Sequence, residues 1–149
     1  MADARRIATQ YVDAFNAHDE ERIRALNAEN GVVEAPGDVR VEGRDAVTAY
    51  AMGWLNAFSD SRITIHGEIA EGDWIAQRFT FEGTHDGVLA SPAGDVPPTH
   101  RRLTGRGVQL LRVEGDAVAE TQLYFDQVQL MTQLGMAPAP PQQAIKTSR

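Results

Sequence analysis

The chain has 149 residues, of which 42% are hydrophobic, a formal net charge of −7 at pH 7 and no cysteine. This length and composition predict one globular domain with a buried core, and the acidic balance argues against a nucleic-acid partner. Disulfides, thiolate nucleophiles and cysteine-bound metals are excluded. The sequence shows neither a membrane-length apolar run nor the apolar segment of a signal peptide, so we expect no membrane partner and a cytoplasmic location.

The first half of the chain predicts three helices around one short strand. The predicted helices cover residues 3–17, 20–26 and 45–58, and the predicted strand covers residues 32–34. In the first helix Tyr11 and Phe15 share one apolar face at helical spacing. In the third helix Trp54 and Phe58 belong to an aromatic stripe, a pattern that is more typical of plain core than of a cofactor site.

The second half predicts an antiparallel meander and a short closing helix. The predicted strands cover residues 62–69, 74–82, 103–113 and 118–125. A turn at Glu114-Gly115-Asp116 joins the last two strands into a β-hairpin. Residues 83–102 form a long connection rich in Gly and Pro, which is typical of a lid or a binding loop. The order of elements predicts an α+β fold in which helices cover one face of a curved sheet.

The hairpin has two unlike faces, because side chains alternate along a strand. Its odd-numbered face carries Gln109, Leu111, Val113, Thr121, Leu123 and Phe125. Its even-numbered face carries Arg106, Arg112, Glu120 and Gln122 among apolar residues. We expect the odd face to line a cavity together with Phe79, Phe81 and Trp54, at the usual size of several hundred Å³. The even face would meet solvent or another subunit.

Several short motifs lie in this order of elements and span nearly the whole ordered chain. They are Ala14-Phe15-Asn16, Gly43-Arg44, Gly53-Trp54, Gly83-Thr84-His85, Pro97-Pro98-Thr99, Arg101-Arg102 and Gln133-Leu134-Gly135. With them the chain resembles the SnoaL-like polyketide and ester cyclases of the nuclear transport factor 2-like superfamily. The resemblance implies a cone-shaped barrel of a curved, mainly antiparallel sheet with three N-terminal helices and a short C-terminal helix. This domain would cover residues 1–136, before a flexible Pro-rich tail at 137–149.

The resemblance also implies a function. The known cyclases close a polyketide ring by an intramolecular aldol reaction without metal or organic cofactor. The resemblance further implies a deep apolar pocket for a small polyketide-like ligand and a homodimer formed through the outer sheet. It also implies a place in antibiotic biosynthesis. However, the family's acid/base aspartate corresponds to Leu123 here, and a histidine that some members use corresponds to Gln109. A leucine cannot transfer a proton, so the family mechanism does not carry over intact.

Three residues remain as catalytic candidates: Gln109, Tyr11 and Asp126. The amide of Gln109 can donate to a developing enolate oxygen or to an internal partner, because leaving it unpaired costs about 1–3 kcal/mol. Tyr11 matches, by resemblance to ketosteroid isomerases of the same superfamily, an oxyanion-binding tyrosine; alternatively it is a core tyrosine. Asp126 is either a replacement base or the N-cap of the closing helix, with Gln129 as its capping partner.

The candidate ligand-binding residues are mainly aromatic. They are Phe15, Trp54, Phe58, Phe79, Phe81, His85 and Leu123. His85 or His100 could act as a base if the 83–102 connection folds over the pocket, although a solvated loop histidine is commoner. The histidines lack the spacing of a helical zinc site, so no metal is expected.

Three functional hypotheses follow. The first is a SnoaL-like enzyme that performs cofactor-free cyclisation, or related enolate chemistry of an aldol-type lyase or isomerase, on a hydrophobic carbonyl compound. The second is a divergent family member that acts as a hydroxylase or isomerase in the same pocket. The third is a non-catalytic ligand-binding module. A carboxylate or imidazole close to Gln109 would favour an enzyme, whereas an entirely apolar lining would favour a binder.

Overall fold

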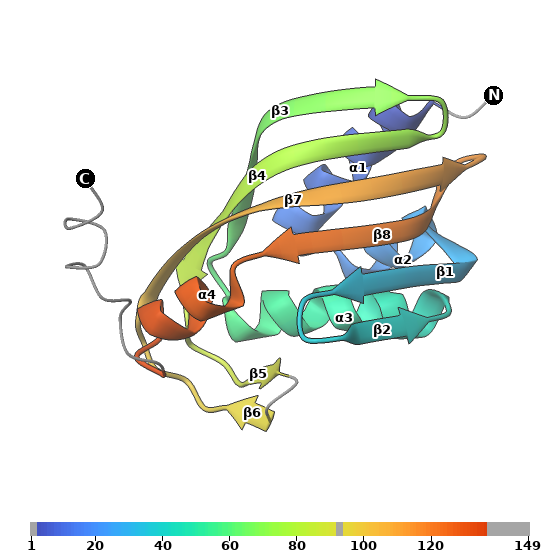
Figure 1. The fold of residues 1–149 in the computed structure, drawn as a ribbon. Helices are drawn as coiled ribbons and strands as arrows, with labels where there is room; N and C mark the ends of the chain where they lie inside the picture. The colour runs from blue at the N-terminus through green and yellow to red at the C-terminus, as the bar shows by residue number, and fades with distance from the viewer. Residues whose placement is uncertain (1–2, 92–93, 137–149) are drawn as a thin grey trace, which may run out of the picture.

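The computed structural model describes residues 3–91 and 94–136, so the predicted tail at 137–149 lies outside the described residues. The helices are α1 (Ala4–Asn16), α2 (Glu20–Leu26), α3 (Arg44–Ala57) and α4 (Gln127–Gln133). The strands are β1 (Asn27–Ala35), β2 (Val39–Glu42), β3 (Arg62–Glu71), β4 (Trp74–Thr84), β5 (Leu89–Ser91), β6 (Gly94–Val96), β7 (Arg102–Glu114) and β8 (Ala117–Phe125). Six strands form one sheet in the order β2-β1-β8-β7-β4-β3, and β5 pairs with β6 (Figure 1).

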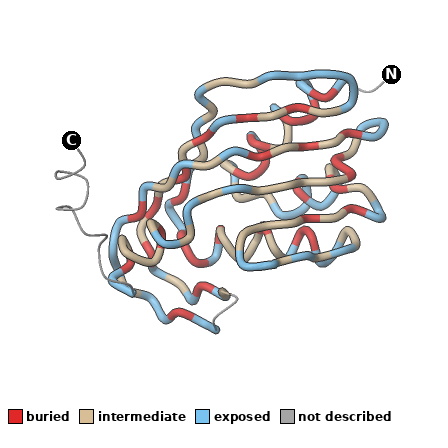
Figure 2. Tube along the Cα trace, viewed as in Figure 1, coloured by how far each residue is buried: buried red, intermediate tan, exposed pale blue. Residues whose placement is uncertain are grey.

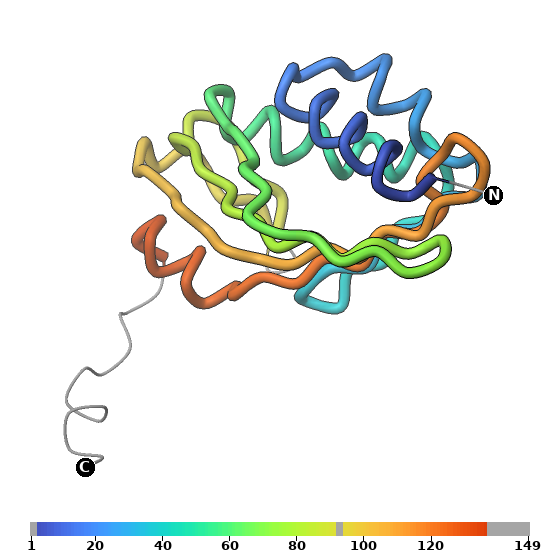
Figure 3. Tube along the Cα trace, turned by 90° about the horizontal axis from the view of Figure 1, so that it is seen from above, coloured from blue at the N-terminus to red at the C-terminus, as the bar shows by residue number. Residues whose placement is uncertain are grey.

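The sheet is strongly curved, and α1, α2 and α3 lie against its concave side (Figure 3). The short helix α4 lies beyond the end of β8 (Figure 1). All neighbouring strands of the sheet are antiparallel except β1 and β8, which are parallel. The predicted α+β fold is therefore confirmed, with its three N-terminal helices and its short C-terminal helix. Within the described residues the sheet stays open, with β2 and β3 at its edges, so it does not close into a full barrel.

Three of the helices begin with an aspartate N-cap. Asp3, Asp19 and Asp126 each accept a hydrogen bond from the backbone N–H three residues ahead, at 3.0, 3.1 and 3.0 Å. An aspartate in extended conformation satisfies one of the free N–H groups of the first turn in this way. These caps explain where α1, α2 and α4 start, and they confirm that Asp126 is an N-cap.

The register of the β7–β8 hairpin confirms the predicted alternation. Gln109 lies directly opposite Leu123. Gln109, Leu111 and Val113 are buried, whereas Val108 on the other face is exposed. Figure 2 shows the same alternation of buried and more exposed positions along the central strands. The odd-numbered face therefore points inward, as expected, except beside the turn, where a register shift between Arg112 and Val113 brings Val118 into the core as well.

Two elements were not predicted from the sequence. The strand β2 follows a tight turn in which Gly37 and Asp38 have φ values of 88° and 63°. Because a positive φ at consecutive positions suits a hairpin turn, the chain reverses there and β2 pairs with β1. The connection at 83–102, expected as one long loop, contains the small β5–β6 hairpin, in which Leu89 pairs with Val96.

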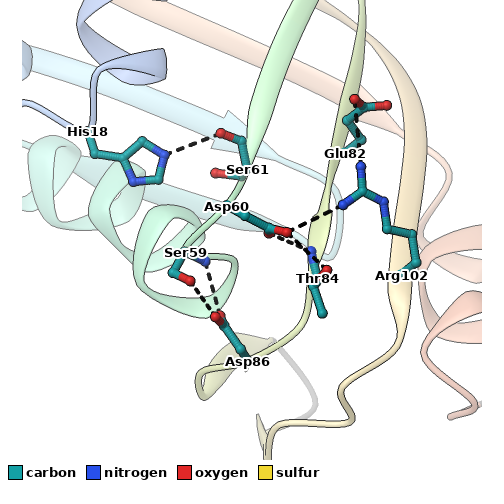
Figure 4. A network of polar contacts seen from close by, with 8 residues as sticks. All are labelled: His18, Ser59, Asp60, Ser61, Glu82, Thr84, Asp86 and Arg102. Atoms are coloured by element: carbon teal, nitrogen blue, oxygen red, sulfur yellow. Dashed lines mark hydrogen bonds and ion pairs between the residues drawn. The ribbon is translucent and has the colours of Figure 1, made fainter.

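A polar network fastens the turn between α3 and β3 to the ends of β4 and β7 (Figure 4). Asp60 accepts hydrogen bonds from the Thr84 backbone N–H at 2.7 Å and from the Thr84 hydroxyl at 3.0 Å. Arg102 approaches the same carboxylate at 3.4 Å. The hydrogen bond from the Thr84 backbone lowers the pKa of Asp60. In the same turn Ser59 donates to Asp86 through both its backbone N–H and its hydroxyl.

Two clusters of buried side chains lie between the helices and the sheet. We call the first the aliphatic core; it consists of Ala4, Ile7, Ala8, Ile75, Leu111, Val113 and Val118. We call the second the aromatic core; it is built around Phe15, Phe58, Phe79 and Phe81, with the aliphatic residues Leu55, Leu89, Leu103, Leu130 and Leu134 among others. Tyr11 packs against both cores, since α1 runs across the two. None of the helices in the described part of the chain has the length and apolar character needed to cross a membrane.

Candidate functional site

The aromatic core contains a cavity of about 110 Å³. Its aromatic walls come from α1, α3, β4 and β8, which contribute Phe15, Trp54, Phe79, Phe81 and Phe125. The ring of Trp54 meets those of Phe81 and Phe125 edge to face, with centroids 5.7 and 5.6 Å apart. Such edge-to-face contacts fix the rings more firmly than aliphatic contacts do. The expected continuous cavity between the hairpin, β4 and α3 is therefore present, but Leu111 and Val113 of the odd-numbered face belong to the aliphatic core and do not line it.

The size of the cavity differs from the expectation. Sites for drug-sized ligands usually measure roughly 300–1,000 Å³, whereas this cavity measures about 110 Å³. Trp54 stacks on Phe58, with ring centroids 6.3 Å apart, and Phe15 meets Phe81 edge to face. These ring contacts occupy space that could not be predicted to be filled from the sequence.

The polar groups of the cavity are few. They are Tyr11, Tyr50, Arg106, Gln109, Thr121, Asp126 and Gln129. The sequence placed Arg106 on the outward face of the hairpin; it is exposed, but it also contributes to the lining. Arg106 can reach the cavity because β7 curves along its length and because a long arginine side chain can extend around the cavity edge.

Gln109 has an internal partner. Its Nε2 donates to Oε1 of Gln77 at 2.9 Å, and Gln77 Nε2 donates to Glu68 Oε2 at 3.1 Å. Glu68 in turn pairs with Arg5 of α1. A row of polar side chains thus runs from the cavity, across β4, to the edge strand β3 and the helix surface.

The carboxylate of Glu68 fixes the orientation of both amides in this row. A carboxylate only accepts hydrogen bonds, so Gln77 must turn its NH₂ group toward Glu68 and its carbonyl oxygen toward Gln109. Gln109 must then offer an N–H to Gln77. Its carbonyl oxygen and its second N–H are left for the cavity. Gln109 therefore offers a ligand one acceptor and one donor, held in place by residues behind it.

Tyr11 lines the cavity from α1. Burial raises its pKa to about 12, and the neighbouring Asn27 side chain partly opposes that rise. Its hydroxyl is consequently protonated at neutral pH, so it is a donor and not a base. Asn27 is fully buried and donates from Nδ2 to the Thr48 hydroxyl at 3.0 Å.

Asp126 is the only carboxylate in the lining formed by the described residues. It is exposed, at the point where β8 ends and α4 begins. Its Oδ1 accepts the Gln129 backbone N–H at 3.0 Å, which leaves the second oxygen free of any hydrogen bond within the described residues. Asp126 is therefore both the cap of α4 and an acidic group at the cavity.

The structure brings most of the predicted site residues together. The cavity is lined by Tyr11, Phe15, Trp54, Phe79, Phe81, Gln109, Leu123 and Asp126. Phe58 and His85 lie outside the lining: both are fully buried and pack on each other with centroids 5.2 Å apart. The Nδ1 of His85 accepts the Thr99 backbone N–H at 3.2 Å, so this histidine ties the 83–102 connection to the aromatic core.

Sequence reasoning missed Gln77, which holds Gln109 in place. The available signal was a glutamine at a buried strand position, between Ile75 and Phe79. Such a position demands a polar partner. Among the described residues, no group of three His, Asp or Glu side chains is placed to hold a metal ion.

The family model described as SnoaL-like polyketide cyclase matches residues 5–134. The chain belongs to the SnoaL-like polyketide cyclase family. No curated protein sequence matches it.

Several solved structures share the fold of this chain. One is AclR from Streptomyces galilaeus, a proposed hydroxylase, at 26% identity and a TM-score of 0.79, covering 99% of this chain and 95% of that one. Another is a proposed SnoaL-like polyketide cyclase from Jannaschia sp. CCS1, at 19% identity and a TM-score of 0.79, covering 91% and 93%. A third is IdmH from Streptomyces antibioticus, a proposed polyketide cyclase, at 24% identity and a TM-score of 0.73, covering 90% and 99%.

Proposed function

We propose that this SnoaL-like protein is an enzyme that forms an enolate from a hydrophobic, polyketide-like carbonyl compound without a cofactor, and that it uses the enolate for ring closure. One observation carries the proposal. An aromatic cavity holds a locked amide, Gln109, and a protonated phenol, Tyr11, and the same cavity has one carboxylate, Asp126. A lining with donors and a proton acceptor suits enolate chemistry better than simple apolar binding.

The reaction divides among these three residues. The free oxygen of Asp126 takes a proton from the carbon next to the substrate carbonyl. The electron pair moves onto the carbonyl oxygen, which accepts hydrogen bonds from Tyr11 and from the second N–H of Gln109. The enolate carbon then attacks a second carbonyl of the same molecule, and the resulting alkoxide takes the proton back from Asp126, which restores the carboxylate. Neither donor changes its protonation state, so both can be in place before the charge develops.

The test follows proton exchange at carbon. Acetophenone is a one-ring ketone, and its methyl protons exchange with deuterium in D₂O in a way that NMR can follow. We expect the protein to accelerate this exchange. Tyr11→Phe and Gln109→Leu should each lower the acceleration by about 10²–10³, the usual cost of losing one such donor. Asp126→Asn should abolish it at unchanged melting temperature, because Asn caps a helix as well as Asp.

Other outcomes would decide against the proposal. Full activity in all three variants would contradict the donor and base assignments. Tight binding of acetophenone without any acceleration of exchange would favour a non-catalytic binding module. Activity retained in Asp126→Asn alone would leave Asp126 as a cap and place the base elsewhere.

A second candidate is hydroxylation in the same cavity. It is favoured by the likeness to AclR, a proposed hydroxylase, which covers 99% of this chain. It is also consistent with leucine at position 123, where the cyclases place their aspartate. Oxygen consumption by the protein in the presence of an aromatic ketone, measured with an oxygen electrode, would distinguish hydroxylation from cyclisation.

We also propose a homodimer formed by the outer face of the sheet. Val108 and Tyr124, adjacent across β7 and β8, are exposed on this face. Arg112 lies near Glu120 on the same face, at 3.5 Å. Pairing the face with its copy would bury the apolar residues while the charges stay matched. A mass of 16.3 kDa by light scattering at micromolar concentration would contradict this proposal.

A further inference from the structure

A second cavity, of about 140 Å³, lies next to the first. It is lined mainly by residues of α3, α4, β5 and the turn after β1, and it is mostly apolar. Four residues line both cavities: Tyr50, Trp54, Phe125 and Leu130. The two spaces are therefore separated by side chains that belong to both walls.

The volumes indicate what the two cavities could hold. An engineered cavity of roughly 150 Å³ holds a benzene-sized ligand. The first cavity, at about 110 Å³, is smaller than this reference, so a compound with several carbonyls needs more space. Trp54 and Phe125 line both cavities and meet edge to face, so the two spaces can join only if one of these rings changes rotamer and this contact is broken.

Gly53 supplies an independent observation. It lies inside α3 and lines the second cavity but not the first. A Cβ built at Gly53 would meet no atom within 4 Å, so the helix leaves open space at this point. Glycine destabilises a helix interior relative to alanine. Here it widens the hollow between α3 and the β5–β6 hairpin.

We propose that the second cavity is a subsite for the distal part of an elongated hydrophobic ligand whose reacting carbonyl lies in the first cavity. The wall of Tyr50, Trp54 and Phe125 opens when such a ligand binds. This inference rests on the proposed function, since it assigns the second cavity to the same carbonyl substrate. The β5–β6 hairpin then determines the length of the ligand, through Leu89 and Ala90.

The test uses a series of phenyl alkyl ketones: acetophenone, butyrophenone and hexanophenone. Isothermal titration calorimetry should show that affinity for the wild-type protein rises about threefold to fourfold for each added methylene. Gly53→Leu fills the second cavity, so it should bind acetophenone within twofold of wild type and lose the gain from the longer chains. Gly53→Ala is the matched control, because it improves the helix but adds only one methyl group. Gly53→Ala should keep the rise in affinity with chain length.

A second variant shows whether a loss of affinity in Gly53→Leu comes from a damaged fold and not from the filled cavity. Ala90→Leu fills the same cavity from the β5–β6 hairpin, where the residue is exposed, and should cause the same loss. Retention of the full chain-length gain in both leucine variants would overturn the inference. An affinity that does not rise from acetophenone to hexanophenone in the wild type would also overturn it, while leaving the proposed function intact. Failure of acetophenone itself to bind would contradict the proposed function, and the inference with it.

Discussion

The aliphatic core and the aromatic core lie under the same sheet and share α1, but they are packed differently. In the aliphatic core Ile7, Leu111 and Val113 are at most 1% exposed. In the aromatic core Phe58 is also fully buried, but Phe15 and Phe81, both 8% exposed, border a cavity. Protein interiors are normally close-packed, so the cavity distinguishes the aromatic core from the aliphatic core.

The helix α1 contributes to both cores and has a different role in each. The first turns of α1 place Ala4, Ile7 and Ala8 in the aliphatic core, and the last turns place Phe15 in the aromatic core. The aliphatic core holds α1 on the sheet, which allows the aromatic core to remain incompletely filled. Variants in each core should therefore differ in their effects on stability and on binding.

The largest effect is expected from shortening a leucine in the aliphatic core. Leu111→Ala should lower the free energy of unfolding by about 2–5 kcal/mol, because the new cavity cannot close in a packed region. Leu123→Ala should cost clearly less, since Leu123 is half-buried and already borders a cavity. Urea denaturation of both variants measures the difference. Equal losses would show that the two cores are packed alike.

A second prediction concerns the glycine beneath Phe79. Gly107 lies opposite Phe79 in the sheet, and an added Cβ would come within 2.6 Å of the Phe79 ring and 2.5 Å of the Tyr124 carbonyl oxygen. Gly107→Ala should therefore cost about 1–3 kcal/mol, the usual cost of overpacking. Gly105→Ala is the control, because its Cβ would lie 4.0 Å from the nearest atom. Thermal melts that give equal shifts would contradict the prediction.

A smaller effect is expected at the helix caps. Asp126→Ala removes the cap of α4, and Asp3→Ala removes the cap of α1 at the aliphatic end. Each should cost about 1 kcal/mol by urea denaturation. Only Asp126→Ala should also weaken the binding of acetophenone, because α4 borders the cavity through Leu130. Weakened binding in Asp3→Ala would mean that the two cores are coupled.

The smallest effect should come from pH. Burial lowers the pKa of His85, which packs on Phe58 in the aromatic core; the nearby His100 also lowers it, and Asp86 opposes the shift. In the unfolded chain the pKa is about 6.5. Stability from the neutral imidazole is therefore complete above pH 6.5 and is lost as the pH falls below that value toward the lower pKa of the folded state.

The matched variant for this prediction is His85→Gln, which cannot titrate. Melting temperatures of both proteins at pH 7.5 and pH 5.5 should show a larger decrease for the wild type. An equal decrease in the two proteins would assign the acid sensitivity to other groups. The aliphatic core contains no ionisable side chain, so it should not contribute to this difference.

The strand β1 covers Asn27–Ala35, although only residues 32–34 were predicted as a strand. The sequence was sufficient to predict the helices, the strands β3, β4, β7 and β8, and the inward face of the hairpin. Each of these depends on a local period, such as the alternation that places Gln109 and Leu123 on one face. The strand β2 was not predicted, because four residues are too few to show a clear alternation and Pro36-Gly37 indicates the end of a strand. The turn at Gly37 and Asp38 became clear only with its backbone angles.

The candidate site was less predictable than the fold. The sequence identified most of the lining, since an aromatic residue at an inward position must lie in the core. It could not show that Gln77 lies opposite Gln109, because this pairing depends on how β4 and β7 align. It also could not show that His85 packs on Phe58 away from the cavity, because the course of a connection rich in Gly and Pro is set by tertiary contacts.

The parallel pairing of β1 with β8 has a consequence for how the chain acquires its structure. Val33 pairs with Thr121, so a central part of the sheet joins an early segment of the chain to a late one. Contacts this distant in sequence slow folding, because a long loop must close before they form. The edge of β1 that faces β8 can form its hydrogen bonds only after β8 has been synthesised, so this part of the sheet is completed late.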